Sequence, residues 1–187
     1  MNPANYLTNQ FIVAMPTLAD PLFFRTVTYL CQHNAEGALG IVINKLTDMK
    51  LGEVFKQMDI NVTYPPAAEA AVFAGGPVHQ ERGFVVHTAC GDWQATLPVS
   101  STISLTTSRD VLEAIAAGEG PEQYLVALGY AGWGAGQLEK EILDNAWLNT
   151  PCNNQVMFDT PINLRWTAAA EQIGIDINQL TAPAGHA

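Results

Sequence analysis

Residues 129–147 constrain the fold of this chain more than any other stretch. The apolar run 124–128 leads into four glycines, at positions 129, 132, 134 and 136, and the spacing of apolar residues after them predicts a helix over 137–147. Glycine tolerates backbone conformations and close approaches that other residues do not. The turn is therefore expected to pack tightly between a strand and a helix.

The spacing of these glycines does not match a phosphate-binding loop. A dinucleotide-binding turn follows the pattern G-x-G-x-x-G and a P-loop requires G-K-[ST], and neither pattern occurs here. Glu139 and Glu141 also lie close to the start of the predicted helix, where their negative charges would repel a phosphate. The sequence indicates a structural role for the turn.

Glu139 lies on the apolar side of the predicted helix. On a helical wheel one arc holds Leu138, Ile142, Leu143, Ala146 and Trp147. The opposite side holds Gln137, Lys140, Glu141 and Asp144. A carboxylate within the apolar arc should be poorly solvated and needs hydrogen-bond donors. In a functional reading, Glu139 is a general acid/base or an anchor for a ligand. In a structural reading, it is a hydrogen-bond acceptor at the helix start or the partner of an internal arginine, Arg25 or Arg165.

Three further polar residues, His33, Gln137 and Asn44, are candidates for ligand or partner binding beside Glu139. His33 and Glu36 could supply two metal ligands, but no second cluster has ligand spacing, and no metal or cofactor is predicted. Asn44 ends an apolar strand, either as a turn residue or as a ligand contact.

The sequence holds one possible nucleophile pair and lacks the known catalytic motifs. His87 could pair with Cys90, but no third group that would orient the histidine is identified, so a core or sheet-face histidine is favoured. The patterns G-x-S-x-G and H-E-x-x-H are absent from the sequence.

The remaining pattern indicates an α+β protein in one domain, residues 1–187. Strands are expected at 11–15, 26–31, 38–43, 71–74, 83–88, 123–129 and 156–158, with a hairpin joining the second and third. Helices are expected at 51–58, 107–117, 137–147 and 164–173. The helix 107–117 has Thr107 as its expected cap and Gly118 as its stop, and Gly75-Gly76-Pro77 reads as a turn that needs positive φ. Strands in clusters, without regular β-α-β alternation, favour the mixed class.

Charge and composition exclude several classes of function. The formal net charge is −10, and the eight basic residues are scattered, so direct nucleic-acid binding is disfavoured. No apolar run reaches the length of a membrane span, and the first residues do not resemble a signal peptide. Three separated cysteines fit reduced thiols. The expected location is the cytoplasm.

Several segments together resemble one bacterial family. They are 11–16 (FIVAMP), 20–23 (DPLF), 33–44 (HNAEGALGIVIN), 75–78 (GGPV), 82–87 (RGFVVH), 129–133 (GYAGW), 136–139 (GQLE), 145–147 (NAW) and 185–187 (GHA). In order and over nearly the whole chain, they resemble the YqgE/AlgH family, with Lys45 in place of an expected arginine. The resemblance implies a mixed, largely antiparallel sheet folded into a flattened pseudo-barrel flanked by helices, and a cytosolic bacterial protein. One branch of that family is described as a transcriptional regulator, and no catalytic residues carry over.

Two functions follow as hypotheses. The first is a non-enzymatic cytosolic regulatory or adaptor protein that affects transcription indirectly, with an exposed apolar patch that binds a basic protein partner. The second is a small-molecule sensor or an enzyme with a pocket near Glu139, where that residue meets Gln137, Asn44 or His33. The first is favoured because catalytic motifs are missing.

Overall fold

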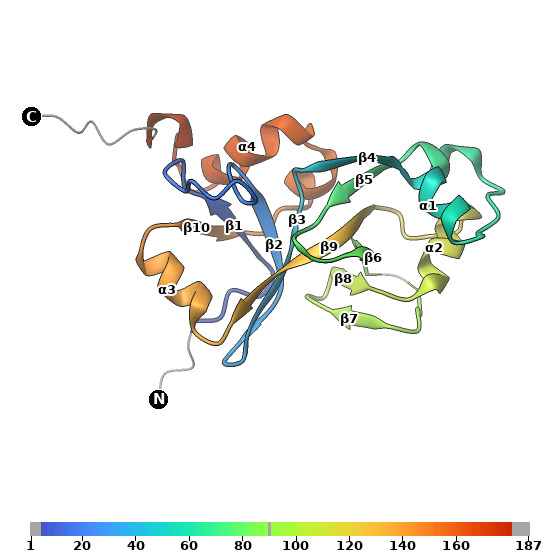
Figure 1. Cartoon of the computed structure of the whole chain (residues 1–187), viewed down its shortest axis with the longest axis horizontal. Helices are drawn as coiled ribbons and strands as arrows, with labels where there is room; N and C mark the ends of the chain where they lie inside the picture. Colours follow the sequence, from blue (N-terminus) through green and yellow to red (C-terminus); the bar gives the residue numbers. More distant parts are fainter. Residues whose placement is uncertain (1–4, 90, 181–187) are drawn as a thin grey trace, which may run out of the picture.

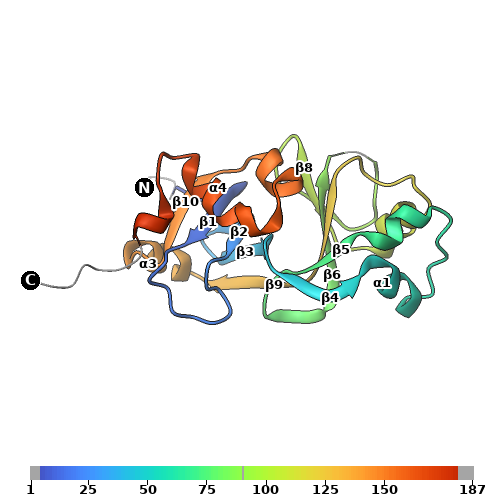
Figure 2. The same ribbon diagram turned by 90° about the horizontal axis from the view of Figure 1, so that it is seen from above.

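Strand β9 (Tyr124–Gly134) is the element around which the sheet is organised. The computed structural model describes residues 5–89 and 91–180, and Figures 1 and 2 show its ribbon in two orientations. The first half of β9 pairs antiparallel with β6 (Val78–Thr88) and parallel with β5 (Ala71–Ala74), and its second half pairs antiparallel with β3 (Gly37–Val42). One long strand thus joins the two halves of the molecule.

The other strands extend the sheet on both sides of β9. The order is β10-β1-β2-β3-β9-β6-β8-β7, and β4 pairs with β5 beside this path. The remaining bounds are β1 Gln10–Ala14, β2 Val27–Asn34, β4 Leu46–Lys50, β7 Thr96–Pro98, β8 Ile103–Thr106 and β10 Trp147–Pro151. Apart from the β5·β9 pair, the strand pairs formed by the described residues are antiparallel. The sheet curls into a half-barrel, which confirms the expected α+β class and the pseudo-barrel.

Four helices cover this sheet at different places. They are α1 Leu51–Gln57, α2 Arg109–Ala116, α3 Gln137–Leu143 and α4 Arg165–Glu171, with short turns at Pro65–Glu69, Gln155–Asp159, Ile162–Leu164 and Ile177–Leu180. In Figure 1, α1 and α2 lie together at one end of the molecule and α3 lies at the other. No helix among residues 5–89 and 91–180 is long and apolar enough to span a membrane.

Three clusters of buried side chains hold these layers together. The largest lies between the sheet and α4 and includes Phe11, Tyr29 and Trp166. The second lies beneath α1 and α2, and the third lies beneath α3 around Leu138 and Trp147. Burying one large apolar side chain contributes about 1.5–3 kcal/mol, so these clusters contribute much of the stability of the fold.

Most predicted elements are present, three predictions need correction, and the sequence pattern did not predict β4, β7, β8 and β10. The strand expected at 156–158 is a π-helical turn, Gln155–Asp159. Helix α3 ends at Leu143, and Trp147 begins β10 instead of ending the helix. Helix α2 begins at Arg109, one residue later than Thr107 as a cap would require, so its N-cap is Ser108.

The glycine-rich segments cross each other at the centre of the fold. Gly76 has φ +155°, and a Cβ on it would lie 2.1 Å from the carbonyl carbon of Tyr130. Gly129 has φ +78°, and its Cβ would lie 2.4 Å from the carbonyl oxygen of Gly76. The expected positive φ at Gly75-Gly76-Pro77 and the close packing of both segments are confirmed, but residues 129–134 continue strand β9, and the turn before α3 is limited to residues 135 and 136.

The cysteines that the structure describes are free thiols. Cys31 is buried and Cys152 is partly buried. Desolvation raises the pKa of both thiols, that of Cys152 to about 12, so they stay protonated near neutral pH. Cys90, and with it the suggested pair with His87, lies outside the described residues.

Candidate functional site

The structure brings together two of the four candidate residues, His33 and Glu139. The Nδ1 atom of buried His33 accepts the amide of Leu7 at 3.0 Å, so we place the imidazole proton on Nε2, which donates to the Glu139 carboxylate. The ring of Tyr6 packs against the imidazole, with centroids 5.1 Å apart. Both nitrogens of His33 are occupied, and the contact fastens the start of α3 to strand β2.

Glu139 is better solvated than the helical wheel suggests. Because α3 ends early, Leu143 is 82% exposed and Trp147 belongs to a strand, so the apolar face of the helix is narrow. The Glu139 side chain lies at the edge of that face and is 42% exposed. Its hydrogen-bond partner is His33, and neither Arg25 nor Arg165 pairs with it.

Gln137 belongs to a neighbouring network centred on Glu141. Its side-chain oxygen accepts the amide of Gly134 at 2.9 Å, and its nitrogen donates to Glu141 at 2.9 Å. The other carboxylate oxygen of Glu141 accepts the indole N–H groups of Trp133 and Trp147, at 3.1 and 3.0 Å. Sequence reasoning placed Glu141 on the solvent side and missed this role. The two tryptophans were the available signal, since buried indole N–H groups require acceptors.

Replacing Glu139 tests whether the His33 contact is structural. Glu139→Gln keeps an oxygen that can accept from His33 Nε2, so we expect a loss of about 1 kcal/mol or less in the free energy of unfolding. Glu139→Leu leaves the buried Nε2–H without an acceptor and should cost about 1–3 kcal/mol. Urea denaturation of both variants measures the difference. Equal stability of wild type and Glu139→Leu would contradict a structural role.

Asn44 lies apart from this pair and organises a different surface. Its Oδ1 atom accepts the amide of Val27 at 2.8 Å, and its Nδ2 donates to the carbonyl of Arg25 at 2.9 Å. These bonds hold Arg25 at φ +55°, a conformation that is uncommon for a residue with a side chain. Asn44 therefore fixes the connection between β1 and β2 against the start of β4.

Exposed apolar side chains surround Asn44 and the β1–β2 connection that it holds. Leu22 is 58% exposed, Leu46 is 52% exposed and Phe24 is 44% exposed. Leu22 and Leu46, with Pro21 and Pro77, line a groove of about 280 Å³. We call the surface formed by Leu22, Phe24, Arg25, Lys45 and Leu46 the Asn44 face.

The cations of the Asn44 face are unpaired. Lys45 is the charged residue that lines the groove, and neither it nor Arg25 forms an ion pair with any residue the structure describes. The Arg25 guanidinium packs 5.3 Å from the Phe24 ring centroid and 5.0 Å from that of Trp166. Lys50, Arg109 and Lys140 are all paired with carboxylates. Asp20, the acid next to the groove, accepts the amide of Leu22 at 2.8 Å.

Two buried polar atoms of the described residues, the Thr28 hydroxyl and the Trp93 indole nitrogen, lack a hydrogen-bond partner, whereas His87 and Thr106 are satisfied within the fold. His87 donates from Nδ1 to the carbonyl of Thr88 at 2.8 Å, and its Nε2 lies 2.7 Å from the hydroxyl of Thr106. Burial lowers the pKa of His87, which keeps the ring neutral. Thr106 has no solvent-exposed surface, and its hydroxyl is also bonded to Thr96 at 2.8 Å. The pair resembles a base and a nucleophile in its spacing, but no substrate atom can reach it in this conformation.

Arg165 is a buried cation held by backbone carbonyls. Its Nε donates to Thr160 at 2.9 Å and its Nη1 to Ile43 at 2.8 Å. Desolvation lowers the pKa of the guanidinium, and Asp159 opposes this. Groups of three or more potential metal ligands are absent from the described residues.

The curled, mostly antiparallel sheet, with the β1–β2 connection held by Asn44, defines an α+β pseudo-barrel protein. Comparison with known proteins shows the family to which it belongs. The model of an AlgH-like family matches residues 11–178, and the chain belongs to this family. A UPF0301 protein of Methylococcus capsulatus is 54% identical over 98% of this chain and 97% of its own length. A UPF0301 protein of Thioalkalivibrio sulfidiphilus is 54% identical over the full length of both chains.

Solved structures give the same result. The solution structure of the AlgH protein from Pseudomonas aeruginosa matches with a TM-score of 0.81 and 46% identity, covering 100% of this chain and 99% of that chain. A crystal structure from Corynebacterium diphtheriae matches with a TM-score of 0.74 at 18% identity, covering 98% of this chain and 95% of that chain, and so shares the fold. Both the resemblance seen in the sequence and the fold it implied are confirmed.

Proposed function

We propose that this protein is a non-enzymatic regulatory or adaptor protein that docks a short apolar and acidic segment of a partner protein on the Asn44 face. The main support for this proposal is the groove between Leu22 and Leu46, which is also lined by the unpaired ammonium of Lys45. Exposed apolar grooves of this kind are typical of interaction sites. An apolar side chain fills the groove, and a neighbouring carboxylate pairs with Lys45.

The charge of the groove favours an acidic segment over the basic partner expected from composition. A net charge of −10 repels acidic proteins at long range. Screening limits that repulsion to about 8 Å at physiological ionic strength, so the nearest charges, Lys45 and Arg25, dominate once the segment is in contact. A short segment with few carboxylates fits this balance better than a strongly acidic protein.

Several features support binding over catalysis at the predicted residues. His33 has both ring nitrogens bonded, and the Thr106 hydroxyl near His87 is inaccessible. The Asn44 face offers apolar contacts and cations, without a nucleophile and base in contact. Any effect on transcription would pass through the partner, because the basic residues are too few and too scattered to hold a phosphate backbone.

Selection from a library of random twelve-residue peptides displayed on phage tests this proposal. We expect selected peptides to combine Leu, Ile or Phe with an adjacent Asp or Glu. Binding of the best peptide, measured by fluorescence anisotropy in 150 mM salt, should weaken at least ~10-fold, about 1.4 kcal/mol, in Leu46→Ser and in Lys45→Glu.

Two exposed residues elsewhere provide matched controls. Leu143→Ser and Lys56→Glu make the same chemical changes on α3 and α1, away from the groove, and should leave peptide affinity within about twofold. The proposal is wrong if no peptide is enriched, if basic peptides are enriched, or if all four variants bind alike. A dimer in light scattering that Leu46→Ser dissociates would also overturn it, because a second copy would then cover the face.

A further inference from the structure

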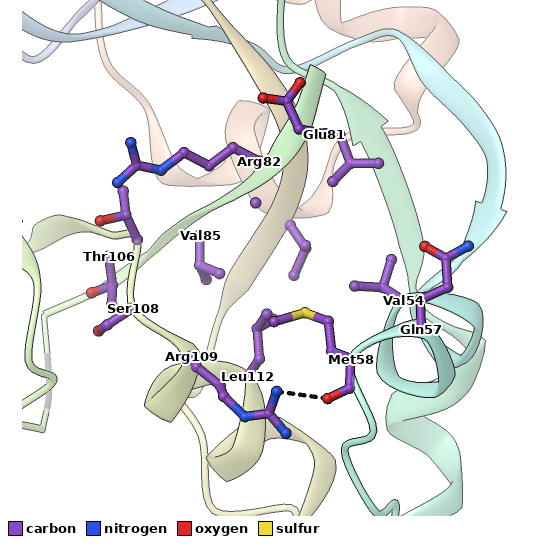
Figure 3. Close-up of a pocket in the computed structure, with 14 residues that line it drawn as sticks. Val54, Gln57, Met58, Glu81, Arg82, Val85, Thr106, Ser108, Arg109 and Leu112 are labelled. Carbon is purple, nitrogen blue, oxygen red and sulfur yellow. Dashed lines mark hydrogen bonds between the residues drawn. The ribbon is translucent and has the colours of Figure 1, made fainter. Parts of the chain in front are cut away.

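A second concave site lies at the other end of the molecule, between α1, α2 and the sheet. It encloses about 450 Å³, within the usual range for small-molecule sites. Its floor is apolar and is formed by Val85, Val126 and Leu128, and its sides include Leu112 and Met58. Figure 3 shows these helices and strands converging on the pocket. None of its lining residues belongs to the Asn44 face.

The two arginines of this pocket have different roles. Arg109 donates to the carbonyls of Met58 and Asp59, at 2.6 and 3.3 Å, and to the carboxylate of Glu113 at 3.2 Å. These bonds tie α2 to the end of α1 and occupy the guanidinium, as the dashed line in Figure 3 illustrates. The Arg109 side chain therefore shapes the side of the pocket, and its guanidinium is already bonded within the protein.

Arg82 is the available cation. Its guanidinium has no hydrogen bond or ion pair with residues 5–89 or 91–180, and it packs 5.7 Å from the ring centroid of Phe84. In Figure 3 it extends across the rim toward Thr106 and Ser108. The adjacent Glu81 lies 3.6 Å from His79 Nδ1. The N-terminus of α2 does not compete with Arg82 for an anion, because the carboxylate of Asp110 already accepts the amide N–H groups of Val111 and Gln94 there.

We infer that this pocket binds a small amphipathic carboxylate, with the carboxylate on Arg82 and the hydrocarbon part against Val85, Val126 and Leu112. A guanidinium matches a carboxylate with two parallel hydrogen bonds, and it loses less hydration than an ammonium when it does so. The apolar floor has no donors to satisfy a polar body. The inference goes beyond the docking function and rests on different residues, so either can fail without the other.

Calorimetric titration with a series of straight-chain carboxylates tests the inference on the full-length protein. Hexanoate, octanoate and decanoate should bind with an affinity that rises about fourfold per added methylene until the pocket is full. Octanamide, which has the same length without the charge, should bind at least ~10-fold more weakly than octanoate, and inorganic phosphate should not bind measurably.

Substitutions of two exposed cations distinguish binding in the pocket from nonspecific binding elsewhere on the surface. Arg82→Gln should weaken octanoate at least ~10-fold and abolish the preference over octanamide, whereas Lys56→Gln on α1 should change neither. The methyl NMR signal of Met58 should shift on titration in the wild-type protein. The inference is overturned if octanoate and octanamide bind equally, if Arg82→Gln binds like wild type, or if no carboxylate binds at millimolar concentration.

Discussion

Gly76→Ala should lower the free energy of unfolding by roughly 3–5 kcal/mol, enough to leave a protein of ordinary stability largely unfolded on mild heating. The new Cβ would lie 2.1, 2.2 and 2.4 Å from the carbonyl carbon and oxygen of Tyr130 and the amide nitrogen of Ala131. All three are backbone atoms of β9, so no side chain can move aside. The φ of +155° at Gly76 adds strain for any residue with a Cβ.

Gly83→Ala is the matched control for this prediction. Gly83 lies in β6, and a Cβ there would meet nothing within 4 Å. Its stability should stay within about 0.5 kcal/mol of wild type. Urea denaturation of the two variants in parallel gives the comparison. A Gly76→Ala protein as stable as Gly83→Ala would show that the crossing of the glycine segments is looser than described.

Glu141→Ala should have the second largest effect, a loss of about 2–5 kcal/mol. The change removes the acceptor of two indole N–H groups on tryptophans that are almost fully buried, Trp133 and Trp147. Each buried donor left without a partner costs about 1–3 kcal/mol. The indole proton signals of both tryptophans should also move in the NMR spectrum, which a general loss of helix would not do selectively.

Asp144→Ala provides the comparison on the same helix. Asp144 pairs with Lys140 at 2.8 Å, and both side chains are well exposed. Exposed pairs of this kind contribute little, so this variant should be nearly as stable as wild type and leave the indole signals unchanged. If Glu141→Ala behaved in the same way, Glu141 would not be the acceptor that fixes the tryptophans.

Local sequence signals predicted the hairpin of β2 and β3 and the helices α1, α2 and α4, because each has a clear period and a recognisable end. They failed at α3. Trp147 lies four residues after Leu143, on the same side of the helical wheel, so periodicity alone could not separate it from the helix. Asn145 adopts φ +61° and ends that phase. Asparagine tolerates this conformation, so the Asp144-Asn145 pair was an available turn signal.

The candidate sites were harder to predict, because their residues come from distant segments. His33 and Glu139 are 106 positions apart in the chain and meet only because β9 pairs with β3. Sequence reasoning named His33 as one of three residues that Glu139 would meet, beside Gln137 and Asn44, without singling it out. The groove combines Leu22, Lys45 and Pro77 from three segments, and the second pocket depends on how α1 and α2 pack. Asn44 alone carried a local signal, an amide directly after an apolar strand.

The measurement that tests the docking function most directly is the amide NMR spectrum of the labelled protein titrated with the best selected peptide. We expect the largest shifts at Leu22, Arg25, Lys45 and Leu46, with no comparable change near Glu139. Largest shifts around His33 and Glu139, or around Val126 and Leu128 in the second pocket, would contradict it and move the binding function away from the Asn44 face.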